Sequence, residues 1–143
     1  MRRTVLITGS TDGIGFETAQ RLVAQGHDVL LHGRSDMKLA AAARALVGLG
    51  ADGRVDTFLA DLSDLASVES FADEVLRDVD SLDVLINNAG VFTASEPITR
   101  DGLDIRFAVN TIAPYLLTRR LLPLLSDEGR VVNVSSAAQA PVD

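Results

Sequence analysis

A cluster of glycines between a short apolar run and a helical pattern constrains the fold of this chain more than any other feature. The segment reads Thr8-Gly9-Ser10-Thr11-Asp12-Gly13-Ile14-Gly15. Gly9 permits a tight turn, Gly13 leaves room for a phosphate, and Gly15 lets the following helix pack closely on a sheet. The start of that helix offers free N–H groups and a positive dipole end. A tight turn alone is the alternative, but the strand-loop-helix context favours a phosphate-binding loop.

The rest of the chain alternates short runs rich in β-branched residues with longer helical patterns, which predicts an α/β domain with a parallel sheet. Right-handed crossovers give the strand order 3-2-1-4-5, a doubly wound sheet of Rossmann type, with the ligand site beyond the first and fourth strands. The expected strands are Thr4 to Thr8, Asp28 to His32, Val55 to Ala60, Asp83 to Asn87 and Arg130 to Ser135.

Four helical regions are expected between these strands. The first two run from Ile14 to Gln25 and from Asp36 to Leu49, and Ser63 is expected to cap the third. The fourth follows Asp101 and includes Leu116, Leu117, Leu121, Leu122 and Leu125, with bends or breaks at Pro114 and Pro123.

Composition excludes several classes of protein. The 143 residues, 47% hydrophobic and 23% charged, predict one folded domain rather than a disordered chain. The net charge of -7 argues against a nucleic-acid partner. With no cysteine and only two histidines, His27 and His32, no metal centre is expected. No apolar run suits a signal peptide or a membrane span, so we expect a cytoplasmic protein.

The spacing Thr-Gly-x-x-x-Gly-x-Gly resembles the short-chain dehydrogenase/reductase family, and further segments repeat the resemblance in family order. Asp61-Leu62 follows the third strand and Asn87-Asn88-Ala89-Gly90 the fourth. Asn110 ends Phe107-Ala108-Val109-Asn110, and Val131-Val132-Asn133-Val134-Ser135-Ser136 matches the strand that leads to the catalytic serine. The resemblance spans essentially the whole chain, as one cofactor-binding domain over residues 1–143.

The resemblance implies a role for each of these positions. Asn110 would hold a water in the proton relay, and Ser136 would polarise the substrate oxygen, with Ser135 as the less favoured alternative. Asp61 and Leu62 would contact the adenine ring. The residues expected to bind the cofactor are Gly9, Ser10, Asp12, Gly13, Ile14, Gly15, Arg34, Asp61, Leu62, Asn88, Ala89 and Gly90.

The end of the second strand favours NADP(H) over NAD(H). A carboxylate there binds the ribose 2′-hydroxyl, whereas a nearby arginine accommodates a 2′-phosphate. This chain has Gly33 where the acid would stand and Arg34 next. Arg34 could instead be a solvated residue at the start of a helix. Asp12 weakens the preference, because many NADP-preferring relatives carry a basic residue there.

The family's Tyr-x-x-x-Lys pair, which supplies the general acid/base, does not follow Ser136 in these 143 residues. Tyr115-x-x-x-Arg119 only imitates it upstream, and we interpret Tyr115 as a packing or subunit-interface residue. We therefore expect a chain truncated after the fifth strand, inactive alone, with an exposed apolar sheet edge.

The leading functional prediction is an NADP-dependent oxidoreductase that interconverts an alcohol and a carbonyl, similar to the retinol-dehydrogenase-like branch. The alternative is a non-catalytic nucleotide-binding protein, regulatory or pseudoenzymatic. A phosphate-binding NTPase is excluded, because the loop lacks a Gly-Lys-Ser/Thr ending. The expected partners are a small-molecule alcohol or carbonyl and, from the family, further copies in a dimer or tetramer.

Overall fold

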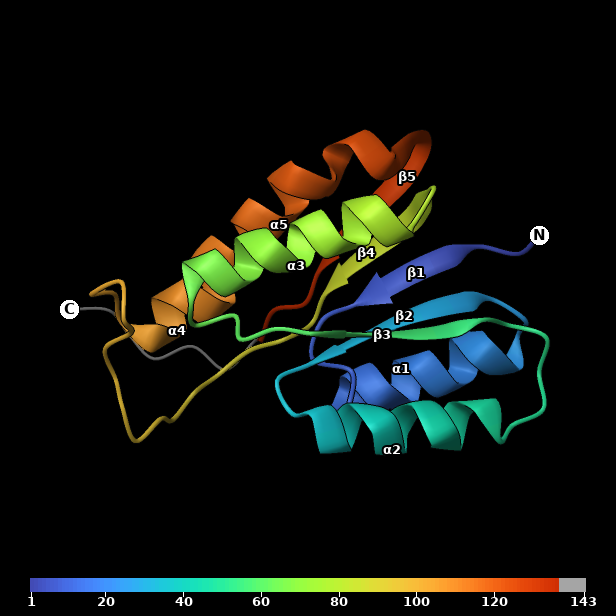
Figure 1. The fold of residues 1–143 in the computed structure, drawn as a ribbon, viewed down its shortest axis with the longest axis horizontal. Coiled ribbons are helices and arrows are strands. Elements are labelled where there is room, and N and C mark those ends of the chain that lie inside the picture. The colour runs from blue at the N-terminus through green and yellow to red at the C-terminus, as the bar shows by residue number, and fades with distance from the viewer. Residues whose placement is uncertain (137–143) are drawn as a thin grey trace.

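Helices cover both faces of a five-stranded parallel sheet in the computed structural model, which describes residues 1–136 (Figure 1). The strand order β3-β2-β1-β4-β5 confirms the predicted order 3-2-1-4-5. The strands are β1 (Thr4–Ile7), β2 (Asp28–Gly33), β3 (Val55–Leu59), β4 (Leu82–Asn87) and β5 (Leu125–Asn133).

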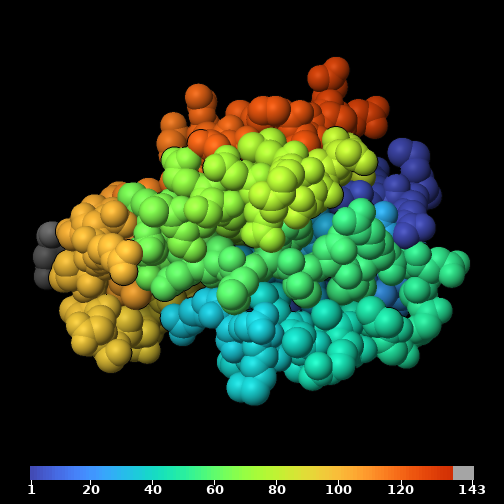
Figure 2. Space-filling model, viewed as in Figure 1, coloured from blue at the N-terminus to red at the C-terminus, as the bar shows by residue number. Residues whose placement is uncertain are grey.

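Two helices lie on each side of the sheet. On one face are α1 (Gly13–Ala24) and α2 (Asp36–Val47), and on the other are α3 (Leu65–Asp78) and α5 (Ala113–Leu121) (Figure 1). A short α4 (Ile105–Phe107) and one π-helical turn, Ala108–Ile112, lead into α5. The segment between β4 and α4 projects from the carboxyl end of the sheet, beyond the ends of α2 and α3 (Figure 2).

The alternation of side chains along β1 divides the core in two. Val5 and Ile7 pack in the cluster that includes α1 and α2, whereas Leu6 packs in the cluster that includes α3 and α5. All three side chains are almost fully buried. Burial on both faces explains why the strand is a continuous apolar run.

The cap of α3 differs from the prediction. Asp64, not Ser63, is the N-cap, and its carboxylate accepts a hydrogen bond from the backbone N–H of Ala66. The backbone N–H and the hydroxyl of Ser63 both donate to the Asp61 carboxylate, at 2.9 and 2.7 Å. Ser63 therefore forms a turn with Asp61, one residue before the N-cap.

The last strand and the helix before it also differ from the prediction. The helix ends at Leu121 in a 3-10 turn that contains Pro123, and β5 already begins at Leu125, which was expected to be helical. Leu125 pairs with Leu82 of β4, residues 126–129 form an irregularity in the register, and regular pairing starts at Arg130, where the strand was predicted to begin. Pro114 does not break the helix, because it lies in the first turn of α5.

The strand β5 lies at one edge of the sheet and leaves apolar side chains exposed. Val131 and Val132 of β5 are exposed, and so is Val134, which directly follows the strand. Tyr115, on α5, is also exposed and therefore is not a core packing residue. Within residues 1–136, no helix is long and apolar enough to cross a membrane.

Candidate cofactor-binding site

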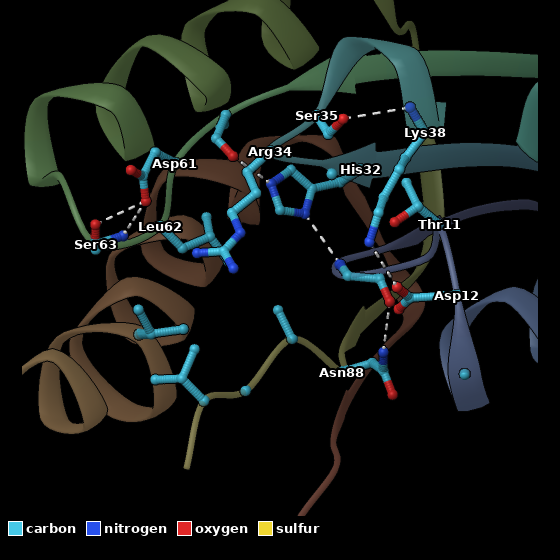
Figure 3. A pocket seen from close by; sticks show the side chains of 18 of the residues that line it. Thr11, Asp12, His32, Arg34, Ser35, Lys38, Asp61, Leu62, Ser63 and Asn88 are labelled. Atoms are coloured by element: carbon cyan, nitrogen blue, oxygen red, sulfur yellow. Dashed lines mark hydrogen bonds and ion pairs between the residues drawn. The ribbon is translucent and has the colours of Figure 1, made fainter. Parts of the chain in front are cut away.

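A cavity of about 620 Å³ opens at the carboxyl ends of β1 to β4, where the strand order reverses (Figure 3). Its walls come from the loops that follow these four strands and from Ile105 and Val109. This is the place where doubly wound sheets bind their ligands. Of the twelve residues predicted to bind a cofactor, the cavity is lined by Gly9, Asp12, Gly13, Ile14, Arg34, Asp61, Leu62, Asn88, Ala89 and Gly90.

Two glycines shape the loop between β1 and α1. Gly9 and Gly13 have φ angles of 61° and 55°, in the left-handed region that other residues rarely adopt. A Cβ on Gly9 would lie 2.9 Å from the Cα of Ala89, so the loops after β1 and β4 can touch only because no side chain stands there. Since α1 begins at Gly13, its first free N–H groups lie at the cavity wall.

Ser10 and Gly15 are the two predicted binding residues that do not line the cavity. Ser10 is fully buried, and its hydroxyl donates to the carbonyl of Ile7 at 2.8 Å and accepts from the N–H of His32 at 2.9 Å. A Cβ on Gly15 would lie 2.6 Å from Nδ2 of Asn88. Both residues therefore position the loop from behind the cavity wall.

The two asparagines at the carboxyl end of β4, Asn87 and Asn88, hold the neighbouring elements together. Nδ2 of Asn88 donates to the carbonyls of Thr8 and Gly9, at 3.1 and 3.0 Å. Nδ2 of Asn87 donates to Oγ1 of Thr118 at 3.1 Å and to Oδ1 of Asn133 at 2.8 Å, which ties β4 to α5 and β5. These bonds fix the mutual position of the loops that form the cavity.

His32 is a residue of the site that the sequence analysis considered only as a metal ligand. Its Nδ1 accepts from the backbone N–H of Gly9 at 3.0 Å, and its Nε2 lies 3.1 Å from the carbonyl of Ala60. The N–H of Gly9 can bond only to an unprotonated Nδ1, so the proton of the neutral ring is on Nε2 and faces Ala60. Its ring stacks on Phe71, with ring centroids 4.9 Å apart.

Burial lowers the pKa of His32 from its ordinary value of 6.5 to about 4, against the opposing effects of the Ala60 carbonyl and the Asp61 charge. The ring is 3% exposed and remains neutral at physiological pH. His32 thus acts as a neutral brace that joins the loops after β1 and β3 at the back of the cavity.

Two cations reach the cavity from the end of β2 and the first turn of α2. Within residues 1–136, the exposed guanidinium of Arg34 has no hydrogen bond or ion pair, and Figure 3 shows it directed into the cavity. Nζ of Lys38 lies 3.4 Å from a carboxylate oxygen of Asp12. The absence of a side chain at Gly33 keeps this corner open, since a Cβ there would lie 2.6 Å from Cγ2 of Thr11.

No cluster of three or more histidine, aspartate or glutamate side chains is placed to hold a metal ion in the described part of the chain. The chemistry of the donors points instead to a phosphorylated organic ligand. Glycine backbone and a helix start suit a pyrophosphate, and the basic side chains suit a further phosphate.

Comparison with known proteins agrees with this arrangement. A family profile described as "short chain dehydrogenase" matches residues 3–141. The chain belongs to the short-chain dehydrogenase family.

Curated members of the short-chain dehydrogenase family that resemble this chain include retinol dehydrogenases. Retinol dehydrogenase 13 of Homo sapiens is 37% identical over 138 residues, which are 95% of this chain and 42% of that protein. Polyprenol dehydrogenase of Homo sapiens is 36% identical over 141 residues, 94% of this chain and 43% of that protein. The chain thus spans less than half the length of these curated relatives.

A solved short-chain dehydrogenase extends the similarity to the fold. The crystal structure of a metagenomic short-chain oxidoreductase in complex with NADP is 34% identical and has a TM-score of 0.80. The match covers 98% of this chain and 65% of that one. The Rossmann-type fold and the family expected from the sequence are both confirmed.

The two positions that were expected to be catalytic, Asn110 and Ser136, are not among the residues that line the cavity. Asn110, in the π-helical turn, accepts from the N–H of Val91 and donates to its carbonyl, both at 2.8 Å. Its amide group thereby orients the loop after β4. Ser136 follows β5 by three residues, at the carboxyl end of the sheet. Their catalytic roles stay predictions.

Proposed function

We propose that residues 1–136 form the NADP(H)-binding part of an oxidoreductase that interconverts an alcohol and a carbonyl. The observation that carries the proposal is the position of Arg34. Its guanidinium lines the cavity without an internal partner among the described residues, and Gly33 stands where a carboxylate would exclude a 2′-phosphate. An arginine can bind a phosphate through two parallel hydrogen bonds.

The residues of the cavity fit NADP(H) from one end to the other. The start of α1 and the left-handed Gly9 and Gly13 would hold the pyrophosphate. The segments Asp61-Leu62 and Asn88-Ala89-Gly90, which also line the cavity, would contact the adenosine and pass close to the rest of the cofactor. The bound cofactor would supply the hydride chemistry, and these residues bind and orient it.

We infer that these 143 residues bind the cofactor but do not turn over substrate by themselves. Reduction of a carbonyl needs a proton donor at the substrate oxygen. The single tyrosine, Tyr115, is exposed on α5 and is not among the residues that line the cavity. Ser136 and Asn110 would serve the substrate oxygen and the proton relay. The similarity of this chain to retinol and polyprenol dehydrogenases favours a lipophilic substrate.

A non-catalytic nucleotide-binding protein remains the second candidate. The glycine loop, Arg34 and the segment Asn88-Ala89-Gly90 line the cavity, whereas Asn110 and Ser136 are not among the lining residues. A turnover assay separates the two candidates. If an assembly that contains this chain oxidises retinol with NADP, the non-catalytic function is excluded.

Titration with NADPH and NADH, followed by the fluorescence of the reduced nicotinamide, tests the proposed cofactor. We expect tighter binding of NADPH, and a loss of roughly 10- to 100-fold in NADPH affinity for Arg34→Ala, with NADH affinity little changed. Arg44→Ala is the matched control, because Arg44 is exposed in the last turn of α2 and does not line the cavity. Equal effects of Arg34→Ala on both cofactors would contradict the assignment.

A further inference from the structure

The carboxylate of Asp12 is placed unusually for a residue at the start of a helix. Asp12 is the N-cap of α1, yet its side chain caps no backbone N–H. Its Oδ2 instead lies 3.4 Å from Nζ of Lys38. An aspartate at this position ordinarily gains a hydrogen bond from the first turn of its own helix. Asp12 lacks that bond, and its carboxylate instead contacts Lys38 on α2.

Lys38 is directed toward the phosphate-binding loop by its position in the first turn of α2. Its backbone N–H donates to the hydroxyl of Ser35, the N-cap of that helix, at 3.4 Å. In Figure 3 its side chain runs from α2 toward Asp12 along the cavity wall. Lys38 thereby brings a positive charge to a loop whose own residues, Thr8 to Gly15, include none.

The ion pair between Asp12 and Lys38 is poorly suited to stabilise the fold. Both side chains are largely exposed, 75% for Asp12 and 63% for Lys38, and exposed pairs of this kind contribute little stability. A phosphate monoester carries more negative charge than one carboxylate and offers three acceptor oxygens. It can therefore take Lys38 from Asp12 at small cost to the protein.

We propose that Lys38 is a second cation for the 2′-phosphate of the cofactor, beside Arg34, and that Asp12 is an internal anion which the phosphate displaces. This inference rests on the proposed NADP(H) function. Lys38 supplies a positive charge from α2 beside the glycine loop, where Asp12 places a negative charge. Asp12 reduces the affinity for every phosphorylated ligand by repulsion, and for a 2′-phosphate also by competition for Lys38.

Two ligands that differ only in the 2′-phosphate isolate the contribution of Lys38. Isothermal titration calorimetry measures adenosine 2′,5′-bisphosphate and adenosine 5′-monophosphate against the 143-residue protein. For Lys38→Met we expect a loss of roughly 10-fold with the bisphosphate and less than about 2-fold with the monophosphate. Lys38→Arg should retain most of the affinity, and Arg44→Met, which removes the same charge from the far end of α2, should lose less than about 2-fold.

Asp12→Asn tests the competition. It should raise the affinity for the bisphosphate by roughly 3- to 10-fold, and by more than for the monophosphate. In the Lys38→Met background this extra gain in affinity for the bisphosphate should vanish, because Asp12 then has no lysine for which it competes with the phosphate. Circular dichroism melting checks that each variant is folded.

The outcomes separate this inference from the proposed function. If the unaltered protein prefers the bisphosphate and Lys38→Met keeps that preference, the role of Lys38 is wrong while the NADP(H) site stands. Additive effects of Lys38→Met and Asp12→Asn would overturn the competition. If the unaltered protein shows no preference for the bisphosphate, the proposed NADP(H) site itself fails.

Discussion

The backbone N–H of Gly9 donates a hydrogen bond of 3.0 Å to Nδ1 of His32, so the glycine loop after β1 is held by an imidazole at the end of β2. Protonation of Nδ1 would replace this acceptor with a second donor. The geometry of the loop is therefore linked to the neutral state of one buried histidine.

We predict that His32 makes stability depend on pH below neutrality. Its pKa in the folded state, about 4, lies below the ordinary 6.5, so on acidification the unfolded state takes up the proton first. The full contribution of His32 is present above about pH 6.5 and is lost as the pH falls toward 4. Urea unfolding should show a loss of about 2 kcal/mol from this group between pH 7 and pH 5.

Replacement of each histidine separates this effect from the titration of carboxylates. His32→Gln should flatten the dependence of the free energy of unfolding on pH in that interval. His27→Gln removes the other histidine of the chain and shows how much of the change is specific to His32. An unchanged slope for His32→Gln would contradict the role assigned to the buried ring.

Gly9→Ala should destabilise the protein and abolish nucleotide binding. The new Cβ would stand 2.9 Å from the Cα of Ala89 on a backbone with φ of 61°, so strain and overlap add. We expect a loss of about 2–4 kcal/mol in the free energy of unfolding. Gly50→Ala has the same left-handed strain, with φ of 68° and open space around the Cβ.

Comparison of the two glycine variants by denaturant unfolding isolates the contact with Ala89. Gly50→Ala should cost only about 1 kcal/mol and should retain nucleotide affinity. Equal losses for Gly9→Ala and Gly50→Ala would show that the close approach of the loops after β1 and β4 does not matter.

Ser10→Ala should weaken the loop without removing any group from the cavity. The buried N–H of His32 and the carbonyl of Ile7 would both lose their bond to the serine hydroxyl. Leaving buried polar groups with weaker partners costs about 1–3 kcal/mol. Chemical unfolding measures the loss, and the exposed Ser70→Ala on α3 is the control, with an expected change below about 0.5 kcal/mol. A Ser10→Ala variant as stable as the parent would contradict the positioning role.

Local patterns predicted the sheet and the wall of the cavity well, for a physical reason. Continuous apolar strands, helical spacing and the glycines of one loop are properties of neighbouring residues, and the crossover rule converts them into the strand order. Gly9 and Arg34 could be placed because each lies within two residues of the end of a predicted strand, and Gly13 because it immediately precedes a predicted helix. The family motifs added the loops after β3 and β4.

The residues that the sequence did not reveal depend on partners far away along the chain. His32 is defined by Gly9 and Ala60, 23 and 28 positions distant, and Lys38 by Asp12, 26 positions distant. The early start of β5 depends on pairing between Leu125 and Leu82. A polar residue near a strand end carries no local sign of which loop it will hold.

The most direct test of the NADP(H) site is a crystal structure of this protein grown with NADPH. We predict a dinucleotide across the carboxyl ends of the strands, with its pyrophosphate at the start of α1 and its 2′-phosphate within hydrogen-bonding distance of Arg34. A nucleotide bound elsewhere, or one whose 2′-phosphate points away from Arg34 into solvent, would contradict the account.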